Sequence, residues 1–503
     1  MKKGKRQEGD GLELPDGNVM KDVDDHGYKY LGVLQKDSIM FVEMKRKVTG
    51  EYFRRLRCLL KSELFAGNLI SGINAWAIGI VRYTAGVLSW TKGDLAKMDV
   101  KTRKTMTIHG AFHIKSDVDR LYMKRKDGGR GLISVTDCVR MEEEILLKYV
   151  TKSEEWMLQK VLQHKVVAGS EARVVVPQVV VPEVVPEVIP EVVPEVVPEV
   201  VPEVAVPEVE VPAAAEPVIP TYKARAMKER TDRFMKKRLH GRFFKGVGED
   251  DEDGKPIAGP RSFEWVKAGY FTPSTEAYLF AAQEQAISTN GKRSLIYKEV
   301  DKDGVSVSQW CRVCGLKVET VAHIAGGCSV LMQGPGTVRH DRVGTRVHWE
   351  LCKKYEVPCS TRWYEHRPQT VCKNASGKIR IYWDMHHYTG DRKIKANKPD
   401  VVVVNDEEKL VTIIDFAVPL DHNVAKTELH KIEKYQPLAA DFRSKHKGSY
   451  RTKIIPVVVG AFGIIPEKLP DYLKELGIPD VVGGLQKTAL LCTRRLVKNA
   501  LSL

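Results

Sequence analysis

A proline-rich repeat in the middle of the chain sets the first limit on its fold. Over residues 174–220 the unit Val-Pro-Glu-Val recurs, and residues 166–220 hold ten acidic residues and one basic residue. Each proline removes a backbone donor and holds the preceding residue extended, so neither a helix nor a central strand can persist. The composition predicts a disordered tether of polyproline II type, about 3.1 Å long per residue. A protein-docking strip is the alternative interpretation.

The rest of the chain is basic. The 503 residues carry a formal net charge of +15, although the tether itself is acidic. A basic body indicates a polyanionic partner, and nucleic acid is favoured over a membrane because no stretch approaches the roughly 20 apolar residues of a spanning helix. Nine cysteines and an N-terminus without an apolar signal core predict an intracellular protein with free thiols.

Four potential metal ligands follow the tether with regular spacing. They are Cys311, Cys314, His323 and Cys328, in the pattern Cys-x2-Cys-x8-His-x4-Cys. Three thiolates and one imidazole complete a closed tetrahedral set for a structural zinc ion. A redox Cys-x2-Cys pair is the rival, but it leaves the other two ligands without a role.

Two carboxylates are predicted to face each other near the C-terminus. Residues 401–404 and 410–418 form two apolar runs separated by a polar gap, which predicts a β-hairpin. A pivot between Glu407 and Glu408 places Asp400 opposite Asp415. Like charges across a sheet repel, so a divalent cation such as Mg²⁺ between them is the simplest explanation. A predicted helix, residues 425–435, carries lysines one turn apart that reach back to the pair, Lys431 and Lys434.

These residues resemble the PD-(D/E)xK core of the restriction-like endonuclease in non-LTR retrotransposons. The phrases IDFAVP, KIEKYQPLAADF and PVVVGAFG are also similar to that endonuclease. The lysine of the simplest motif falls at Ala417, so the resemblance implies that Lys434 or Lys431 takes the catalytic role from the helix. It also identifies the cysteine–histidine set as the family's CCHC knuckle, with Arg312 and Lys317 as phosphate contacts. It implies catalytic Mg²⁺, which Mn²⁺ can replace.

The N-terminal region resembles the part of non-LTR reverse transcriptases that follows the palm. The phrases YKYLGV and HIKSDVDRLYMKRKDGGRGL carry this resemblance, which implies a helical thumb. The polymerase aspartate pair has no counterpart, since Asp24 and Asp25 lie in a polar turn. Reverse transcription by this chain alone is therefore not expected.

Two basic segments are candidate nucleic-acid contacts. Residues 221–246 hold ten basic and two acidic residues and favour a helix. A solvated face is the plainer interpretation, and phosphate binding is the sharper one. The pattern over residues 339–355 predicts an amphipathic helix. The nuclease resemblance implies that this helix adds an acid to the metal site, Asp341 or Glu350, and an ordinary exposed carboxylate is the alternative. The basic candidates are Lys236, Lys237, Arg238, Arg242 and Arg339.

The predicted architecture is mixed. It consists of an α-helical thumb-like region (20–165), the disordered tether (166–220), a basic helical region (221–308), a zinc knuckle (309–330) and an α/β restriction-endonuclease-like domain (339–503). The expected activity is Mg²⁺-dependent cutting of a DNA target in the nucleus or a cytoplasmic ribonucleoprotein, with element RNA or an RNA–DNA hybrid as a second partner. Two alternatives stay open, a non-catalytic nucleic-acid-binding remnant and a segment that acts only within a full-length reverse transcriptase.

Overall fold

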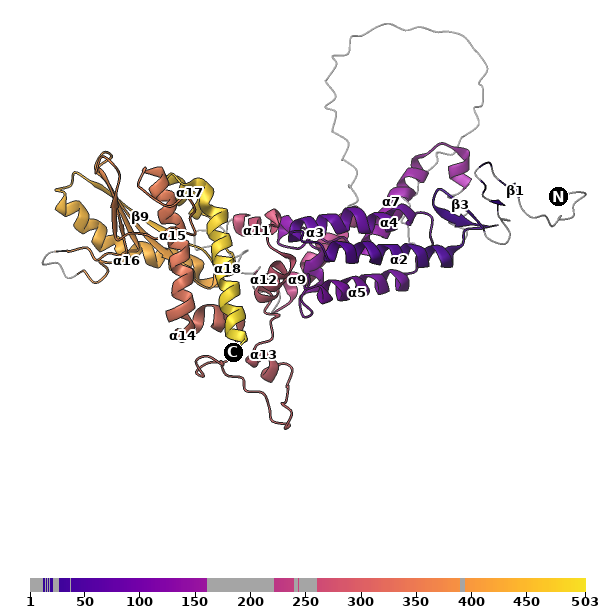
Figure 1. Ribbon diagram of the computed structural model, residues 1–503, viewed down its shortest axis with the longest axis horizontal. Helices are drawn as coiled ribbons and strands as arrows, with labels where there is room; N and C mark the ends of the chain where they lie inside the picture. The colour runs from indigo at the N-terminus through magenta and orange to yellow at the C-terminus, as the bar shows by residue number, and fades with distance from the viewer. Residues whose placement is uncertain are drawn as a thin grey trace, which may run out of the picture. The chain divides into compact units, whose positions relative to one another are not determined.

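The structure is a computed structural model, and it describes residues 12–13, 15, 17, 19–20, 27–36, 38–160, 221–238, 243, 260–389 and 394–503 (Figure 1). The repeat 174–220, the Asp24-Asp25 turn and Arg242 lie outside these residues. Two compact units make up the chain, residues 1–143 with 223–503, and residues 144–222. None of the described helices combines the length and apolar composition that a membrane span requires.

The N-terminal region is mainly helical, as predicted. Two short hairpins come first, β1 (Leu12–Glu13) with β2 (Val19–Met20), and β3 (Tyr28–Tyr30) with β4 (Val33–Gln35). The helices are α2 (Phe41–Leu60), α3 (Ala66–Gly72), α4 (Ile78–Thr84), α5 (Lys92–Ile108), α6 (Val118–Tyr122) and α7 (Val135–Lys152). The phrase YKYLGV spans the turn of the second hairpin, where Leu31 and Gly32 take positive φ values. The apolar segment 69–88 contains the second half of α3 and all of α4, which are joined by a π-helical turn, Ile73–Ala77.

The segment after the tether packs on the N-terminal region through buried charges. It contains α9 (Tyr222–Lys236), α11 (Glu264–Ala268), α12 (Pro273–Gln283) and α13 (Asn290–Leu295). Glu276 on α12 is fully buried and pairs with Arg130 at 3.1 Å and with Arg125 at 2.5 Å. One residue past the end of α12, Glu284 pairs with the fully buried Arg120 at 3.4 Å. The helical segments on the two sides of the tether therefore share one interior.

A five-stranded sheet forms the centre of the C-terminal region. Its order is β5 (Val371–Lys373), β6 (Ile379–Trp383), β7 (Val401–Asn405), β8 (Leu410–Ala417) and β9 (Arg451–Val458). The first four strands are antiparallel, and β9 runs parallel to β8 after the crossover helix α16 (Val424–Lys445). The predicted hairpin is confirmed, and the predicted helix 425–435 is the first half of α16.

Helices cover both faces of this sheet, which explains the unbroken run of valines in β7. Successive side chains of a strand point to opposite faces. Val401 and Val403 pack in one core with α15 (Thr337–Lys354) and α18 (Val482–Leu501), whereas Val402 and Val404 pack against α16. Helices α15 and α18 lie side by side (Figure 1). The fold is thus a mixed α/β layer structure, as expected for this half of the chain.

A close contact fixes α15 against the sheet. At Gly344 a Cβ atom would lie 2.7 Å from the ring of Phe416 on β8 and 2.9 Å from the ring of Trp383 on β6. A larger residue would clash with both rings and push the helix outward. Because His340 lies one turn earlier on α15, this contact also sets its position at the end of the sheet.

Candidate functional site

The β7–β8 register brings the two predicted carboxylates together. Val401 pairs with Ile414, so Asp400, one residue earlier, lies across from Asp415, one residue later. Asp415 is only 2 % exposed. The register follows the sequence-based prediction, because a hairpin pivoting between Glu407 and Glu408 gives the same pairing.

Asp400 receives a cation and a backbone donor. The Nε2 atom of His340 on α15 lies 3.3 Å from Oδ2 of Asp400, and the backbone N–H of Phe416 donates to the same oxygen over 2.6 Å. Burial of Asp400 favours its neutral form, but the hydrogen bond and charge of His340 outweigh burial and lower the pKa of Asp400. Burial likewise opposes charging of His340, yet Asp400 and Asp341 raise its pKa to about 9. Asp400 and His340 are therefore both charged at neutral pH.

Asp415 is held from the other side by α16. The hydroxyl of Tyr435 donates to Oδ1 of Asp415 over 2.6 Å, and the ammonium group of Lys431 forms an ion pair with Oδ2. Lys434 instead donates to the Tyr435 hydroxyl over 2.8 Å. Lys431, Lys434 and Tyr435 share one helix face because they are three and four residues apart. Of the two candidate lysines, Lys431 contacts the carboxylate directly and Lys434 acts through Tyr435.

The chemistry of this pair fits a hard divalent cation. Two carboxylates from adjacent strands offer oxygen ligands of the kind that Mg²⁺ prefers. Two residues of α15, Asp341 and Glu350, were candidates for a third acid at this site, and they differ in position. Asp341 is linked to Asp400 through His340, whose Nδ1 lies 3.0 Å from Asp341 Oδ1, whereas Glu350 pairs with Lys353 at 2.7 Å. Asp341 is thus the acid of α15 connected to the pair.

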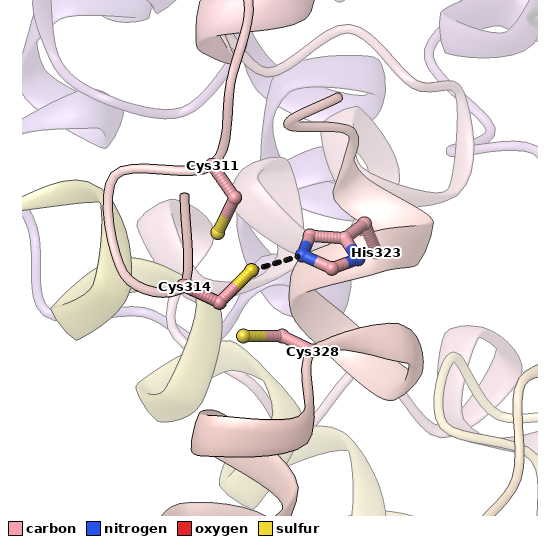
Figure 2. A group of neighbouring side chains, drawn as sticks. All are labelled: Cys311, Cys314, His323 and Cys328. Atoms are coloured by element: carbon pink, nitrogen blue, oxygen red, sulfur yellow. Dashed lines mark hydrogen bonds between the residues drawn. The ribbon is translucent and has the colours of Figure 1, made fainter. Parts of the chain in front are cut away.

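The second predicted site also converges. The ligand atoms of Cys311, Cys314, His323 and Cys328 all lie within 4.8 Å of one another, and their side chains point to a common centre (Figure 2). The first two cysteines occupy a tight turn closed by Cys311 N–H donating to Lys317 O over 2.8 Å, with Gly315 at a φ of +68°. His323 begins a π-helical turn, His323–Gly327, which ends beside Cys328.

The pKa values of two thiols in this cluster shift in opposite directions. A backbone hydrogen bond from Leu316 lowers the pKa of Cys314 to about 6, and His323, 3.3 Å from its sulfur, acts in the same direction. Burial raises the pKa of Cys328. A bound cation would stabilise both as thiolates, the form in which cysteine binds metal. The cluster could hold a metal ion, and its ligand set is compatible with zinc.

Arg312, a predicted phosphate contact, makes several hydrogen bonds within the protein. Its guanidinium donates to both carboxylate oxygens of the buried Glu319 at 2.9 Å, to Asn290 Oδ1 at 3.1 Å and to Leu501 O at 2.8 Å. These bonds fix the cysteine–histidine turn to α13 and to the end of α18. Arg312 therefore has a structural role, and its contact with phosphate stays a prediction. Lys317 is exposed.

The other predicted basic contacts differ in their exposure to solvent. Arg339 is 2 % exposed and donates to Ala325 O, Thr493 Oγ1 and Val418 O, so the prediction that it binds nucleic acid is wrong. The first turn of α15 is covered by the cysteine–histidine turn and α18, a packing that sequence periodicity does not show. Lys237 forms ion pairs with Asp117 and Asp119. Lys236 and Arg238 are exposed.

Two residues of the carboxylate site were not predicted. His340 belongs to the Arg-His-Asp phrase that opens α15, and its position directly before an acid was the available signal. Tyr435 follows Lys434 in the KIEKY phrase, four residues after Lys431, so helical spacing places it beside that lysine. Phe243, in the basic segment 221–246, is 8 % exposed and packs in the core with Phe234.

A scan of the chain against models of protein families gave no match, and a search among curated proteins found no similar sequence.

Proposed function

We propose that this protein is a metal-dependent DNA endonuclease of the PD-(D/E)xK type, derived from a non-LTR retrotransposon. One observation carries the proposal, the opposition of Asp400 and Asp415 at the end of the sheet with Lys431 on the second carboxylate. Two acids and a lysine at the end of a β-hairpin are the groups that this class of nuclease uses. The mixed sheet covered by helices is compatible with that class.

Each residue has a distinct task in this proposal. Asp400 and Asp415 would hold Mg²⁺, or Mn²⁺ in its place, which supplies a water of lowered pKa and neutralises charge on the phosphate when bound. Lys431 stands closest to the pair and would orient the attacking water or meet the phosphate charge. Lys434 and Tyr435 position that lysine and Asp415, because their side chains form a chain of contacts to the same carboxylate.

The charge of the protein supports a nucleic-acid substrate. A net charge of +15 favours association with phosphates through release of counterions. Among the predicted contacts that the structure describes, the exposed cations are Lys317, Lys236 and Arg238. Zinc in the cysteine–histidine cluster would keep Lys317 on a fixed turn. DNA as target and an RNA or RNA–DNA hybrid as second partner rest on the resemblance to the retrotransposon family.

Plasmid nicking tests the proposal. The full chain with Mg²⁺ should convert supercoiled DNA to the nicked form, and Asp400→Asn or Asp415→Asn should abolish this while DNA binding is kept. Glu407→Gln is the matched control, because Glu407 occupies the far end of the same hairpin and pairs with Lys378 on the surface. The wild-type protein could bind DNA without cleaving it, or with cleavage that persists in Asp400→Asn. Either result would favour a non-catalytic binding protein.

A further inference from the structure

A second group of histidines and cysteines lies in the sheet domain, apart from both sites above. His348 and Cys352 are one turn apart on α15, His366 lies in the loop before β5, and Cys372 lies on β5. The ligand atoms of His348, Cys352 and His366 all lie within 4.8 Å of one another. All three residues are buried, with exposures of 1 %, 0 % and 6 %.

The contacts within this group are those of a metal site. Nδ1 of His348 lies 2.8 Å from Nε2 of His366 and 3.4 Å from the sulfur of Cys352. Ligands at normal zinc bond lengths and tetrahedral angles are separated by roughly 3.3–3.6 Å. The sulfur–nitrogen distance falls in this range, and the two imidazole nitrogens, which are 2.8 Å apart, would need to separate by at least about half an ångström. The sulfur of Cys372 lies 3.8 Å from Nε2 of His348, whereas Cys352 and His366 face Nδ1 of the same ring. Cys372 would therefore supply a fourth ligand only after its side chain turns toward the Nδ1 side of His348.

A hydrogen bond between two imidazoles would account for the histidines alone. It does not account for two thiols turned toward the same rings in the interior of the domain. A cavity of about 340 Å³ adjoins the group and is lined by all four side chains together with Cys359, Ser360 and Arg367. This cavity gives an ion a path to the ligands from solvent.

We propose that His348, Cys352, His366 and Cys372 form a second, structural zinc site. The cysteines would bind as thiolates after release of their protons to solvent, and the histidines through neutral ring nitrogens. Four protein ligands leave no open coordination position, so the ion would have no direct part in a reaction.

The place of the site in the fold indicates what it stabilises. Residues 356–370 between α15 and β5 contain no helix or strand of the described structure, and the short β5 pairs with β6 alone. An ion bound to α15, this loop and β5 would join all three. His348 lies eight residues after His340, about 12 Å along the same helix. The site would therefore hold the helix that carries His340 without touching Asp400 or Asp415.

Metal content of the full chain tests this site independently of nuclease activity. Protein purified without chelator should contain two zinc ions per chain. Cys311→Ser and Cys352→Ser should each reduce the content to one, and the double variant to none. Cys359→Ser is the control, because Cys359 lines the cavity but is exposed and outside the ligand group, and it should keep two.

Cobalt spectroscopy covers the case in which Cys352→Ser fails to fold. Co²⁺ bound to the Cys311→Ser protein should show thiolate-to-cobalt charge-transfer absorption that weakens by about half in Cys311→Ser/Cys372→Ser, because one of two thiolates is lost. The proposal would be overturned if the wild-type protein contained one zinc ion and Cys311→Ser contained none. A disulfide between Cys352 and Cys372 in the freshly purified protein would also overturn it. Unchanged cobalt absorption without Cys372 would overturn its assignment as fourth ligand.

Discussion

His340 holds its Nε2 atom 3.3 Å from Oδ2 of Asp400, so the helix that follows the cysteine–histidine turn places a cation against the carboxylate pair. The same ring nitrogen lies 3.2 Å from the carbonyl oxygen of Phe416. With a pKa raised to about 9, His340 is charged at neutral pH and partly neutralises the negative charge that would attract a metal ion. The charged His340 and a divalent cation would therefore compete for the carboxylate of Asp400.

Replacing His340 by Gln tests this competition. Glutamine can still donate a hydrogen bond but carries no charge, so His340→Gln should lower the Mg²⁺ concentration for half-maximal cleavage about fivefold, equivalent to about 1 kcal/mol. A Mg²⁺ titration of plasmid nicking measures the change. His422→Gln serves as control because His422 is exposed at the start of α16. An unchanged or increased Mg²⁺ requirement would mean that His340 does not oppose metal binding.

The two lysines of α16 should differ in their effect on cleavage. Lys431→Ala removes the ion pair with Asp415 and should slow cleavage by about 10²- to 10³-fold, as expected for loss of one charge-stabilising group. Lys434→Ala removes a contact to the Tyr435 hydroxyl and should cost tenfold at most. Single-turnover rates at saturating Mg²⁺ separate the two.

Lys426→Ala is the matched control, because Lys426 is exposed on the same helix and should leave the rate unchanged. DNA binding should persist in all three variants. If Lys434→Ala is the more damaging change, α16 must rotate in the complex with DNA, and the contact between Lys431 and Asp415 does not describe the active arrangement.

Sequence periodicity predicted the features that depend on local order. The run of valines in β7 and the apolar run in β8 fix the hairpin register, and the register alone brings Asp400 across from Asp415. The cysteine–histidine cluster lies within 18 consecutive residues, Cys311 to Cys328, so spacing was sufficient to find it.

Features built from segments far apart in the sequence were missed, because local spacing does not show which segments meet. The ligands of the second cluster come from a helix, a loop and an edge strand, and no short spacing links His348 to His366 or Cys372. Cys352 and Cys372 therefore had no metal pattern in the sequence. Arg339 was predicted to contact nucleic acid because helical periodicity cannot show that α18 covers it. Neither β5 nor β6 was predicted, since both are short and carry polar residues.

The buried charges between the N-terminal helices and α12 should matter for stability. Glu276→Gln removes the negative charge that pairs with Arg130, whose side chain is only 1 % exposed. Breaking a buried pair from one side typically costs about 3–5 kcal/mol, because the remaining charge is left without compensation. The melting transition of the full chain should fall clearly in temperature.

A surface pair gives the comparison for this prediction. Glu475 and Lys453 are 2.9 Å apart with side chains 47 % and 45 % exposed, so Glu475→Gln should cost less than about 1 kcal/mol. Equal shifts in melting temperature for Glu276→Gln and Glu475→Gln would show that the interior shared by the two segments contributes no more than a surface contact.

Asp421 should make stability depend on pH. It is only 8 % exposed and accepts hydrogen bonds from the backbone N–H groups of Phe462 at 2.9 Å and Ile464 at 3.0 Å. Burial nevertheless dominates and raises its pKa to about 6. The folded state therefore binds this proton more tightly than the unfolded state does. The resulting stabilisation is present at pH 4 and is lost as the pH rises through 6, by up to about 3 kcal/mol.

Asparagine at this position keeps one acceptor oxygen and does not titrate. The difference in unfolding free energy between the wild-type protein and Asp421→Asn should therefore shrink as the pH rises from 4 to 6 and then stay constant. Urea unfolding of both proteins at intervals of half a pH unit, followed by tryptophan fluorescence, gives this difference directly. The contributions of groups that titrate in both proteins cancel in the difference. Asp480→Asn, at an exposed position before α18, should show no such trend. A difference that grows between pH 4 and 6 would mean that the backbone N–H groups of Phe462 and Ile464 outweigh burial and that Asp421 is stabilised in its charged form.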